Sequence, residues 1–278
     1  MECVLDDVTV HYVEYGEGFP VLMLHGFSPD HRLMTGCMEP VFADRPGWRR
    51  IYLDLPGMGR TKAADWITGS DEMLSVVERV VERLIPHGAP FLVAGESYGG
   101  YLARGLLTRQ AHRMAGMLLI CPAIHAEKEK RDLPPLTVLA RDEKLLAELT
   151  PEEREEFTSI AVVQDRCSWE RFEREILSGL QMADKHFLNK LKQRFSFSFD
   201  VEPLVGRYDK PVLILTGRQD DCTGYRDVWT ILEHYPRASF VVLDRAGHNL
   251  QIEQSRLFTA LVHEWLDRVE EELRREKR

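Results

Sequence analysis

The sequence predicts an α/β fold in which a doubly wound, mostly parallel sheet carries one inserted helical segment. Three observations support this prediction. Short apolar runs with the length of buried strands alternate along the chain with segments of helical spacing. Such alternation requires crossover connections between parallel strands. The alternation is interrupted once, at residues 123–207, where helical spacing continues without a further core strand.

Eight strands are predicted. The first two alternate polar and apolar residues and are expected to be antiparallel, whereas the later ones are continuous apolar runs, as buried parallel strands are. The strands span about residues 2–5, 8–15, 20–25, 49–54, 90–95, 115–121, 211–216 and 239–243. Helical spacing covers residues 70–85, 97–110, 222–235 and 251–275.

Residues 123–207 are predicted to form an all-helical cap between strands 6 and 7, so that 1–122 and 208–278 make up the core domain. A helix start is expected at Thr150, which can act as N-cap, with Pro151 in the first turn and Glu153 completing a capping box. Further helical stretches are expected at 141–149 and 168–195.

The cap follows the carboxyl end of strand 6, so it is expected to lie over the carboxyl edge of the sheet and to form one wall of a pocket there. Its apolar side chains could line that pocket or pack into the core. The candidates are Trp169, Phe172, Leu180, Met182, Phe187 and Phe195.

The most informative segment places a serine between a strand and a helix. Residues 91–103 read Phe-Leu-Val-Ala-Gly-Glu-Ser-Tyr-Gly-Gly-Tyr-Leu-Ala. Gly95 and Gly99 allow a sharp reversal that holds Ser97 in a strained conformation with its Oγ projecting from the turn. The Tyr98 backbone N–H then lies at a helix N-terminus, where it could stabilise an oxyanion. The segment therefore predicts Ser97 as a nucleophile.

A nucleophilic serine needs a base to take its proton and a carboxylate to orient that base. His248 follows an apolar strand and Gly247, in a loop from which an imidazole could reach Ser97. Three acids follow strands in this part of the chain, Asp220, Asp221 and Asp244. The order along the chain is therefore serine, acid, histidine.

A second oxyanion donor is expected where the strand at 20–25 runs into His-Gly-Phe. The backbone N–H of Phe27 is the predicted donor. His25 is expected to be a buried structural histidine that hydrogen-bonds loop carbonyls, and it is not the predicted base.

Taken together in this order, these motifs resemble the α/β-hydrolase superfamily over nearly the whole chain. The matching segments are His25-Gly26-Phe27, Asp54-Leu55-Pro56-Gly57-Met58-Gly59-Arg60, Gly95-Glu96-Ser97-Tyr98-Gly99-Gly100, Gly217-Arg218-Gln219-Asp220 and Gly247-His248. The resemblance implies a cap after strand 6 and selects Asp220 as the acid. Thr61 stands where the family usually has serine, which keeps a hydroxyl. Ser97 separates the chain from the family's epoxide hydrolases and haloalkane dehalogenases, which use an aspartate there.

Composition favours a single soluble domain that acts on small molecules. The chain has 278 residues, of which 44% are hydrophobic, and it contains no long apolar stretch that would span a membrane. A formal charge of −9, with Lys and Arg interleaved with acids, disfavours nucleic acid. The first residues lack the features of a signal peptide, so a cytoplasmic location is expected. The 5 cysteines are scattered, so we expect them to be free thiols. We expect neither a bound metal nor a cofactor.

The sequence thus predicts a cofactor-independent serine hydrolase that cleaves a small carboxylic ester or lactone through an acyl-enzyme. The layout also resembles proline iminopeptidases and hydrolases of carbon–carbon bonds. A reading of a different class is a ligand receptor that retains Ser97, Asp220 and His248 without rapid turnover. The physiological substrate and the oligomeric state are left open.

Overall fold

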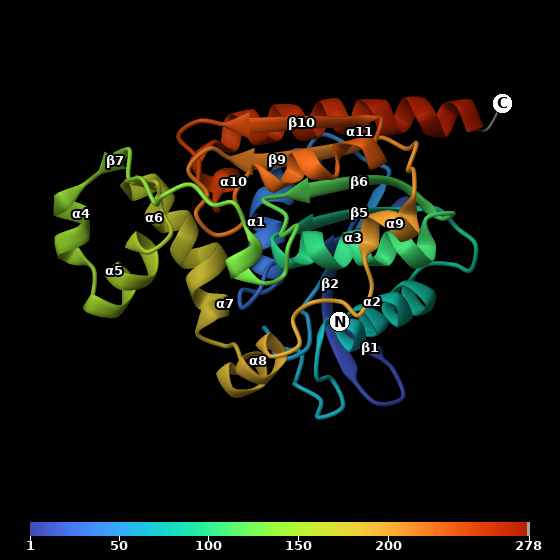
Figure 1. Cartoon of the computed structure of the whole chain (residues 1–278), viewed down its shortest axis with the longest axis horizontal. Coiled ribbons are helices and arrows are strands. Elements are labelled where there is room, and N and C mark those ends of the chain that lie inside the picture. The colour runs from blue at the N-terminus through green and yellow to red at the C-terminus, as the bar shows by residue number, and fades with distance from the viewer. Residues whose placement is uncertain (277–278) are drawn as a thin grey trace.

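The computed structural model describes residues 1–276, and within them it confirms the predicted mostly parallel sheet of eight strands (Figure 1). The strand order is β1-β2-β4-β3-β5-β6-β9-β10, with the pairs β1–β2 and β2–β4 antiparallel and the others parallel. The strands are β1 (Glu2–Val4), β2 (Thr9–Tyr15), β3 (Phe19–Leu24), β4 (Trp48–Leu53), β5 (Phe91–Glu96), β6 (Met114–Ile120), β9 (Val212–Gly217) and β10 (Ala238–Leu243).

Helices cover both faces of the sheet, because its central strands are apolar on both sides. Along β3, Val21 and Met23 belong to one hydrophobic cluster, and Leu22 and Leu24 to the other. The cluster that contains Leu22 is closed by α2 (Ser70–Leu84) and α3 (Tyr98–Gln110). The opposite cluster is closed by α1 (His31–Phe42) and α11 (Ser255–Glu276). This is the doubly wound arrangement that continuous apolar strands require.

Helix α1 was not predicted, because Gly36 and Pro40 within it lower helix propensity. Its start nevertheless carries a signal. The Asp30 side chain accepts a hydrogen bond of 2.9 Å from Arg32 N, as an N-cap residue does. Gly36 is needed because a Cβ there would lie 2.3 Å from Glu175 Cδ. Tertiary packing therefore overrides propensity in this helix.

The prediction of a helix at 222–235 was wrong. The structure has two short 3₁₀ segments, Asp227–Thr230 and Leu232–His234, after an irregular loop. The loop does not become helical because Gly224 adopts a left-handed φ of 71° where it passes the Asp132 backbone. The predicted helix at 251–275 is present, but it is divided into α10 (Leu250–Glu253) and α11.

The segment between β6 and β9 is mostly helical, but the expectation that it is entirely helical was wrong. Its helices include α4 (Glu143–Glu148), α5 (Pro151–Thr158), α6 (Arg166–Phe172), α7 (Ser178–Leu180), α8 (Lys185–Lys192) and α9 (Val201–Val205), with a π-helical stretch at Glu173–Leu177. Two short strands, β7 (Ala140–Arg141) and β8 (Val163–Gln164), pair in parallel within it. The expected capping box at Thr150 is present.

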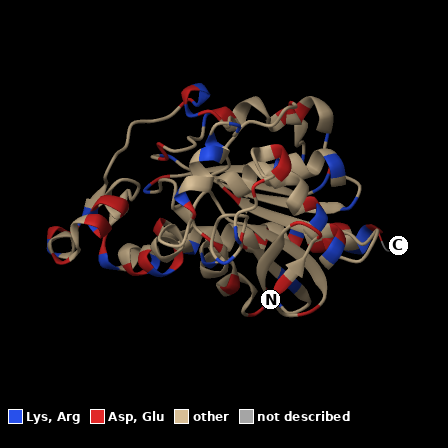
Figure 2. Cartoon of the chain, turned by 90° about the horizontal axis from the view of Figure 1, so that it is seen from below, with Lys and Arg blue, Asp and Glu red and all other residues tan. Residues whose placement is uncertain are grey.

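The inserted segment lies at the carboxyl edge of the main sheet. Figure 1 shows α4, α5 and α6 beyond the end toward which the arrowheads of β9 and β10 point. Figure 2, which views the chain from below relative to Figure 1, shows basic and acidic residues interleaved along the helices. No helix among residues 1–276 is both long and apolar enough to cross a membrane.

Candidate active site

Backbone strain is concentrated at the carboxyl edge of the sheet. Within residues 1–276, the non-glycine residues with positive φ are Ser28, Ser97, Cys121 and Arg245, which come shortly after β3, β5, β6 and β10. Such conformations cost free energy and are typical of functional sites. The strained residues therefore point to a functional site at this edge of the sheet.

Ser97 occupies the turn between β5 and α3 with φ 52° and ψ −112°. The two predicted glycines make this turn possible. A Cβ on Gly95 would lie 2.3 Å from Gly99 O, and a Cβ on Gly99 would lie 2.2 Å from Leu24 O. A side chain at position 99 would therefore collide with the backbone at the end of β3, and one at position 95 would collide with the backbone of the turn.

The structure brings His248 and Asp220 to Ser97. His248 Nε2 lies 2.9 Å from Ser97 Oγ, and His248 Nδ1 lies 3.0 Å from Asp220 Oδ2. The imidazole thus sits between a hydroxyl and a carboxylate, although its neighbours come from loops that are far apart in the sequence. This is the geometry that general-base activation of a serine requires.

The three candidate acids differ clearly in their surroundings. Asp220 is fully buried, and its Oδ1 accepts hydrogen bonds from the backbone N–H groups of Cys222 and Thr223 at 2.8 and 3.0 Å. Asp221 is half-buried, and no contact of its side chain with His248 is seen in residues 1–276. Asp244 is exposed and accepts a hydrogen bond from Gln219. Only Asp220 therefore has its carboxylate fixed against the imidazole.

Opposing effects set the charges of this pair. Burial alone would raise the pKa of Asp220, but the charge of His248 and the hydrogen bonds to Asp220 lower it to about 2. Burial lowers the pKa of His248, whereas the Asp220 carboxylate raises it well above its usual value. Asp220 is thus ionised at neutral pH and can stabilise a protonated imidazole.

The two predicted oxyanion donors belong to residues that pack against each other. The rings of Phe27 and Tyr98 meet edge to face with centroids 5.6 Å apart. Both residues line the same cavity as Ser97 and His248. Phe195, from the inserted segment, stacks on Tyr98 at 4.6 Å and meets Phe27 at 5.0 Å. These aromatic contacts fix both backbone turns relative to the serine.

His25 holds the turn that carries Phe27. Its Nδ1 lies 2.7 Å from Gly26 O, and its Nε2 lies 3.0 Å from the Leu55 backbone N–H. The first contact requires a protonated Nδ1 and the second an unprotonated Nε2, so the ring is neutral. Burial lowers the pKa of His25, which agrees with that state. These contacts fit the structural role expected for His25.

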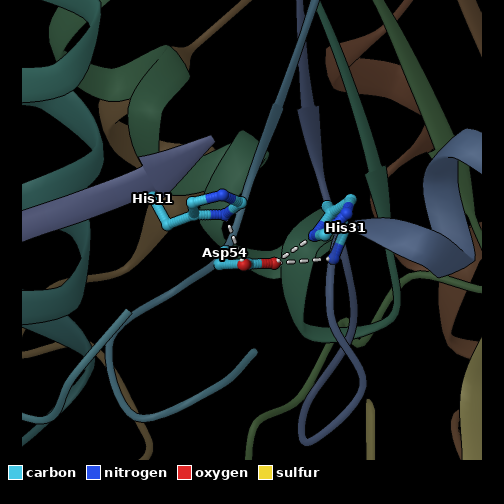
Figure 3. Close-up of side chains that lie close together, drawn as sticks. All are labelled: His11, His31 and Asp54. Carbon is cyan, nitrogen blue, oxygen red and sulfur yellow. Dashed lines mark hydrogen bonds and ion pairs between the residues drawn. The ribbon is translucent and has the colours of Figure 1, made fainter. Parts of the chain in front are cut away.

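His11, His31 and Asp54 form a second cluster of titratable groups (Figure 3). The Nδ1 atoms of His11 and His31 lie 2.8 and 2.7 Å from the two oxygens of Asp54. Asp54 also accepts hydrogen bonds from the backbone N–H groups of His31 and Arg60. Burial raises the pKa of Asp54, but these hydrogen bonds and the nearby imidazoles lower it further than burial raises it. The cluster ties β2, α1 and the loop after β4 together.

Two groups of side chains within residues 1–276 are close enough to hold a metal ion, and both have other partners. In the first, each oxygen of Asp54 already accepts two hydrogen bonds. The second consists of Cys121, Asp220 and His248. Its imidazole is held between Asp220 and Ser97. Hydrogen bonding therefore accounts for both groups.

Two cavities open onto Ser97 and His248. The larger has a volume of about 830 Å³ and is lined by residues that include Phe27, Tyr98 and Phe195. The smaller, of about 200 Å³, is lined by Phe172, Leu180 and Ile176 of the inserted segment. Ile160 borders both cavities. Ser97 and His248 thus lie at the junction of a larger and a smaller cavity.

The six apolar candidates of the inserted segment divide into two groups. Phe172 and Leu180 line the smaller cavity, and Phe195 lines the larger one. The other three lie elsewhere. Trp169 packs against Phe157, Phe187 is buried beside Gly57, and Met182 is largely exposed.

Sequence reasoning missed Glu96, a buried acid that also lines the smaller cavity. Its Oε1 lies 3.4 Å from His248 Nε2. Its position in the sequence could have indicated a role, because a charged residue at the end of a central apolar strand is expected to be buried away from solvent.

Comparison with known proteins agrees with this geometry. The model of the Alpha/beta hydrolase family matches residues 21–261. A crystal structure of an alpha/beta superfamily hydrolase from Oenococcus oeni is 30% identical, covers 97% of this chain and 99% of its own, and superposes with a TM-score of 0.87.

Curated relatives are more distant. Monoacylglycerol lipase of Homo sapiens is 25% identical over 264 residues, which cover 88% of this chain and 74% of that protein. A 2-hydroxy-6-oxo-6-phenylhexa-2,4-dienoate hydrolase of Comamonas testosteroni is 27% identical over 278 residues, covering 94% of this chain and 92% of that protein.

Proposed function

This chain belongs to the alpha/beta hydrolase family, and from that premise we propose that it is a serine hydrolase that cleaves a small carboxylic ester or lactone through an acyl-enzyme. The observation that carries the proposal is the continuous contact from Ser97 Oγ through the His248 ring to Asp220, at 2.9 and 3.0 Å. A hydroxyl, an imidazole and a buried carboxylate in this order act together in acyl transfer.

In the proposed reaction, Ser97 Oγ attacks the carbonyl carbon of the substrate while His248 Nε2 takes the hydroxyl proton. The tetrahedral intermediate collapses when His248 returns that proton to the leaving oxygen, which produces an acyl-enzyme. Water then attacks the acyl group, with His248 again acting first as base and then as acid. Asp220 holds the ring orientation and stabilises its positive charge throughout.

The backbone N–H groups of Phe27 and Tyr98 are the proposed oxyanion donors. Tyr98 is the first residue of α3, so its N–H lies at the positive end of the helix dipole. Phe27 is held by the neutral His25 ring and by the aromatic contact with Tyr98. Rigid donors of this kind stabilise developing charge without reorganisation.

We propose that residues 123–207 act as a cap that selects the substrate. The catalytic groups contact only the reacting carboxyl group, so discrimination between substrates must come from the cavity walls. Phe172, Leu180 and Phe195 supply part of those walls. The alcohol is released first and water must then reach the acyl-enzyme, so the larger cavity suits the alcohol and the smaller one the acyl group.

Turnover on activated substrates tests the proposed function. A screen of p-nitrophenyl esters, lactones, aminoacyl anilides and vinylogous diketones should show many turnovers per protein molecule with esters or lactones. A single slow burst with every ester would indicate a ligand receptor instead. Turnover restricted to the aminoacyl or diketone substrates would replace the ester assignment with one of the two related chemistries.

The smaller cavity should limit the length of the acyl chain. We expect Leu180→Ala to move the maximum of kcat/KM toward longer acyl groups in a series of p-nitrophenyl esters. The gain on a longer ester should be roughly tenfold or more relative to the wild-type ratio, because one methylene in a fitted pocket is worth about 1–3 kcal/mol.

Leu204→Ala is the matched control, since Leu204 lies in the same inserted segment but is 62% exposed. Its length profile should match that of the wild type. If Leu180→Ala changed kcat/KM for all esters by one common factor, the cap would control access to the site without discriminating between acyl chains.

A further inference from the structure

Glu96 is a buried acid that the proposed mechanism does not use. It ends β5 directly before Ser97 and is 2% exposed. Its Oε1 lies 3.4 Å from His248 Nε2, the same nitrogen that lies 2.9 Å from Ser97 Oγ. The imidazole is therefore flanked by a carboxyl group on each side, with Asp220 at Nδ1 and Glu96 at Nε2.

The Glu96 carboxyl group is enclosed on its other sides. It packs under the turn before Phe27, where a Cβ on Gly26 would lie 2.1 Å from Glu96 Oε2. Within residues 1–276, its one ion-pair partner is His248. Burial raises the pKa of Glu96 to about 7, although His248 and the Gly26 backbone oppose this shift. The charge of Glu96 thus changes close to neutral pH.

We propose that Glu96 is a positioning residue for the acyl transfer, whose carboxylate stabilises the protonated His248 ring from the Nε2 side and thereby sets the pH dependence of the reaction. This inference rests on the proposed function. It assigns to the residue before the nucleophile a task that Asp220 cannot perform, because Asp220 contacts the opposite nitrogen of the ring.

The proton balance of the reaction does not change. The proton still passes from Ser97 Oγ to His248 Nε2 and then to the leaving oxygen, and Glu96 neither gains nor loses one in the cycle. An anion beside Nε2 lowers the free energy of the imidazolium that exists in both transition states. In the free enzyme, the same anion also makes the imidazolium harder to deprotonate, because it raises the pKa of His248.

The other titratable groups near this pair are few. Asp220 faces His248 from the loop after β9, and Glu156 stands at the mouth of the smaller cavity. Three thiols complete the set, Cys37 from α1, Cys121 after β6, and Cys222 beside Asp220. Burial raises the pKa of each thiol, so all three are uncharged at neutral pH. Asp221 also interacts electrostatically with His248, but Glu96 and Asp220 are the carboxylates that contact the ring, at 3.4 and 3.0 Å.

The direction of the pH effect follows from these charges. The active form needs a neutral His248 and an ionised Glu96. Protonation of Glu96 as pH falls through about 7 removes the stabilising anion, and protonation of His248, whose pKa is raised by Asp220, removes the base. Without Glu96, His248 would keep its neutral form to a lower pH, because an adjacent anion no longer raises its pKa.

We expect Glu96→Gln, which keeps the shape of the side chain, to move the acid limb of the kcat/KM profile to lower pH by about 1 unit. The same substitution should lower the high-pH plateau by up to about tenfold, because one pKa unit corresponds to a tenfold change in equilibrium. The midpoint of the His248 imidazole signal in a ¹H NMR titration should move down with the acid limb. A purely structural role would lower the plateau without moving either midpoint.

Two further variants make the test specific. Glu96→Asp retains the anion and should keep the acid limb near its wild-type position, even if it lowers the rate. Glu156→Gln removes a charge from the same cavity without touching Nε2, and it should leave the midpoint of the acid limb unchanged. A shift in Glu156→Gln equal to that in Glu96→Gln would overturn the proposal, since any nearby charge would then have the same effect.

The outcomes separate this inference from the proposed function. If Glu96→Gln retained wild-type midpoints in both the rate profile and the NMR titration, Glu96 would have no positioning role while the hydrolase assignment stood. If the wild type neither turned over esters nor reacted with a fluorophosphonate at any pH, the proposed function would fail. In that case the NMR midpoint alone would still report whether Glu96 controls the charge of His248.

Discussion

Ser97→Ala should abolish ester hydrolysis while leaving the protein folded. The expected loss in kcat is roughly 10⁶-fold, the scale found when a serine protease loses its nucleophile. The loss is large because Ser97 carries the hydroxyl that lies 2.9 Å from His248 Nε2, and this nitrogen would then face a methyl group in its place. Burst and steady-state kinetics with a p-nitrophenyl ester measure it.

Covalent labelling gives an independent measure of the same residue. A fluorophosphonate probe should modify the wild-type protein at Ser97 with one probe per chain, and Ser97→Ala should not react. An unchanged circular dichroism spectrum and melting temperature would show that the variant is folded. Stoichiometric labelling that persisted in Ser97→Ala would place the nucleophile elsewhere.

Asp220→Asn should produce the second largest loss, about 10⁴-fold in kcat if the acid behaves as in serine proteases. An amide can donate a hydrogen bond to Nδ1, which favours the wrong tautomer of His248 and removes the charge that stabilises the imidazolium. The buried Asp220 also accepts two backbone N–H groups at 2.8 and 3.0 Å. Thermal unfolding must therefore be measured beside the rate, so that a loss of folded protein is not counted as a loss of catalysis.

The neighbouring residue provides the matched control. Asp221→Asn makes the same chemical change one residue later, on a half-buried side chain that does not hold His248. Its rate should stay within a fewfold of the wild type. Reversed results for the two variants would identify Asp221 as the acid of the site.

Much of the fold could be predicted from the sequence because it depends on local patterns. Each strand of the main sheet lies within one residue of its predicted bounds. The turn at Ser97 was equally local, since Gly95 and Gly99 permit one kind of reversal between a strand and a helix. The capping box at Thr150 is local for the same reason.

Patterns failed where tertiary contacts determine the backbone. Helix α1 forms despite Gly36 and Pro40, because its apolar face packs on the sheet and Gly36 makes room for Glu175. The loop at 222–226 is irregular because Gly224 adopts a left-handed φ of 71° where it passes the Asp132 backbone. In both cases a contact with a segment distant in sequence outweighed local propensity.

The sequence by itself determined the sheet, the position of Ser97 and a short set of partners for it. The tertiary structure alone decided which residues of the inserted segment reach the cavities and that Glu96 faces His248 Nε2, and it placed Asp220, which the family resemblance had selected, against the His248 ring. The physical reason is that strand and helix patterns repeat over a few residues and can be seen in the chain. A site at the carboxyl edge of a parallel sheet joins distant loops, such as those of Ser97 and His248, which are 151 residues apart, and folding alone sets the distances between them.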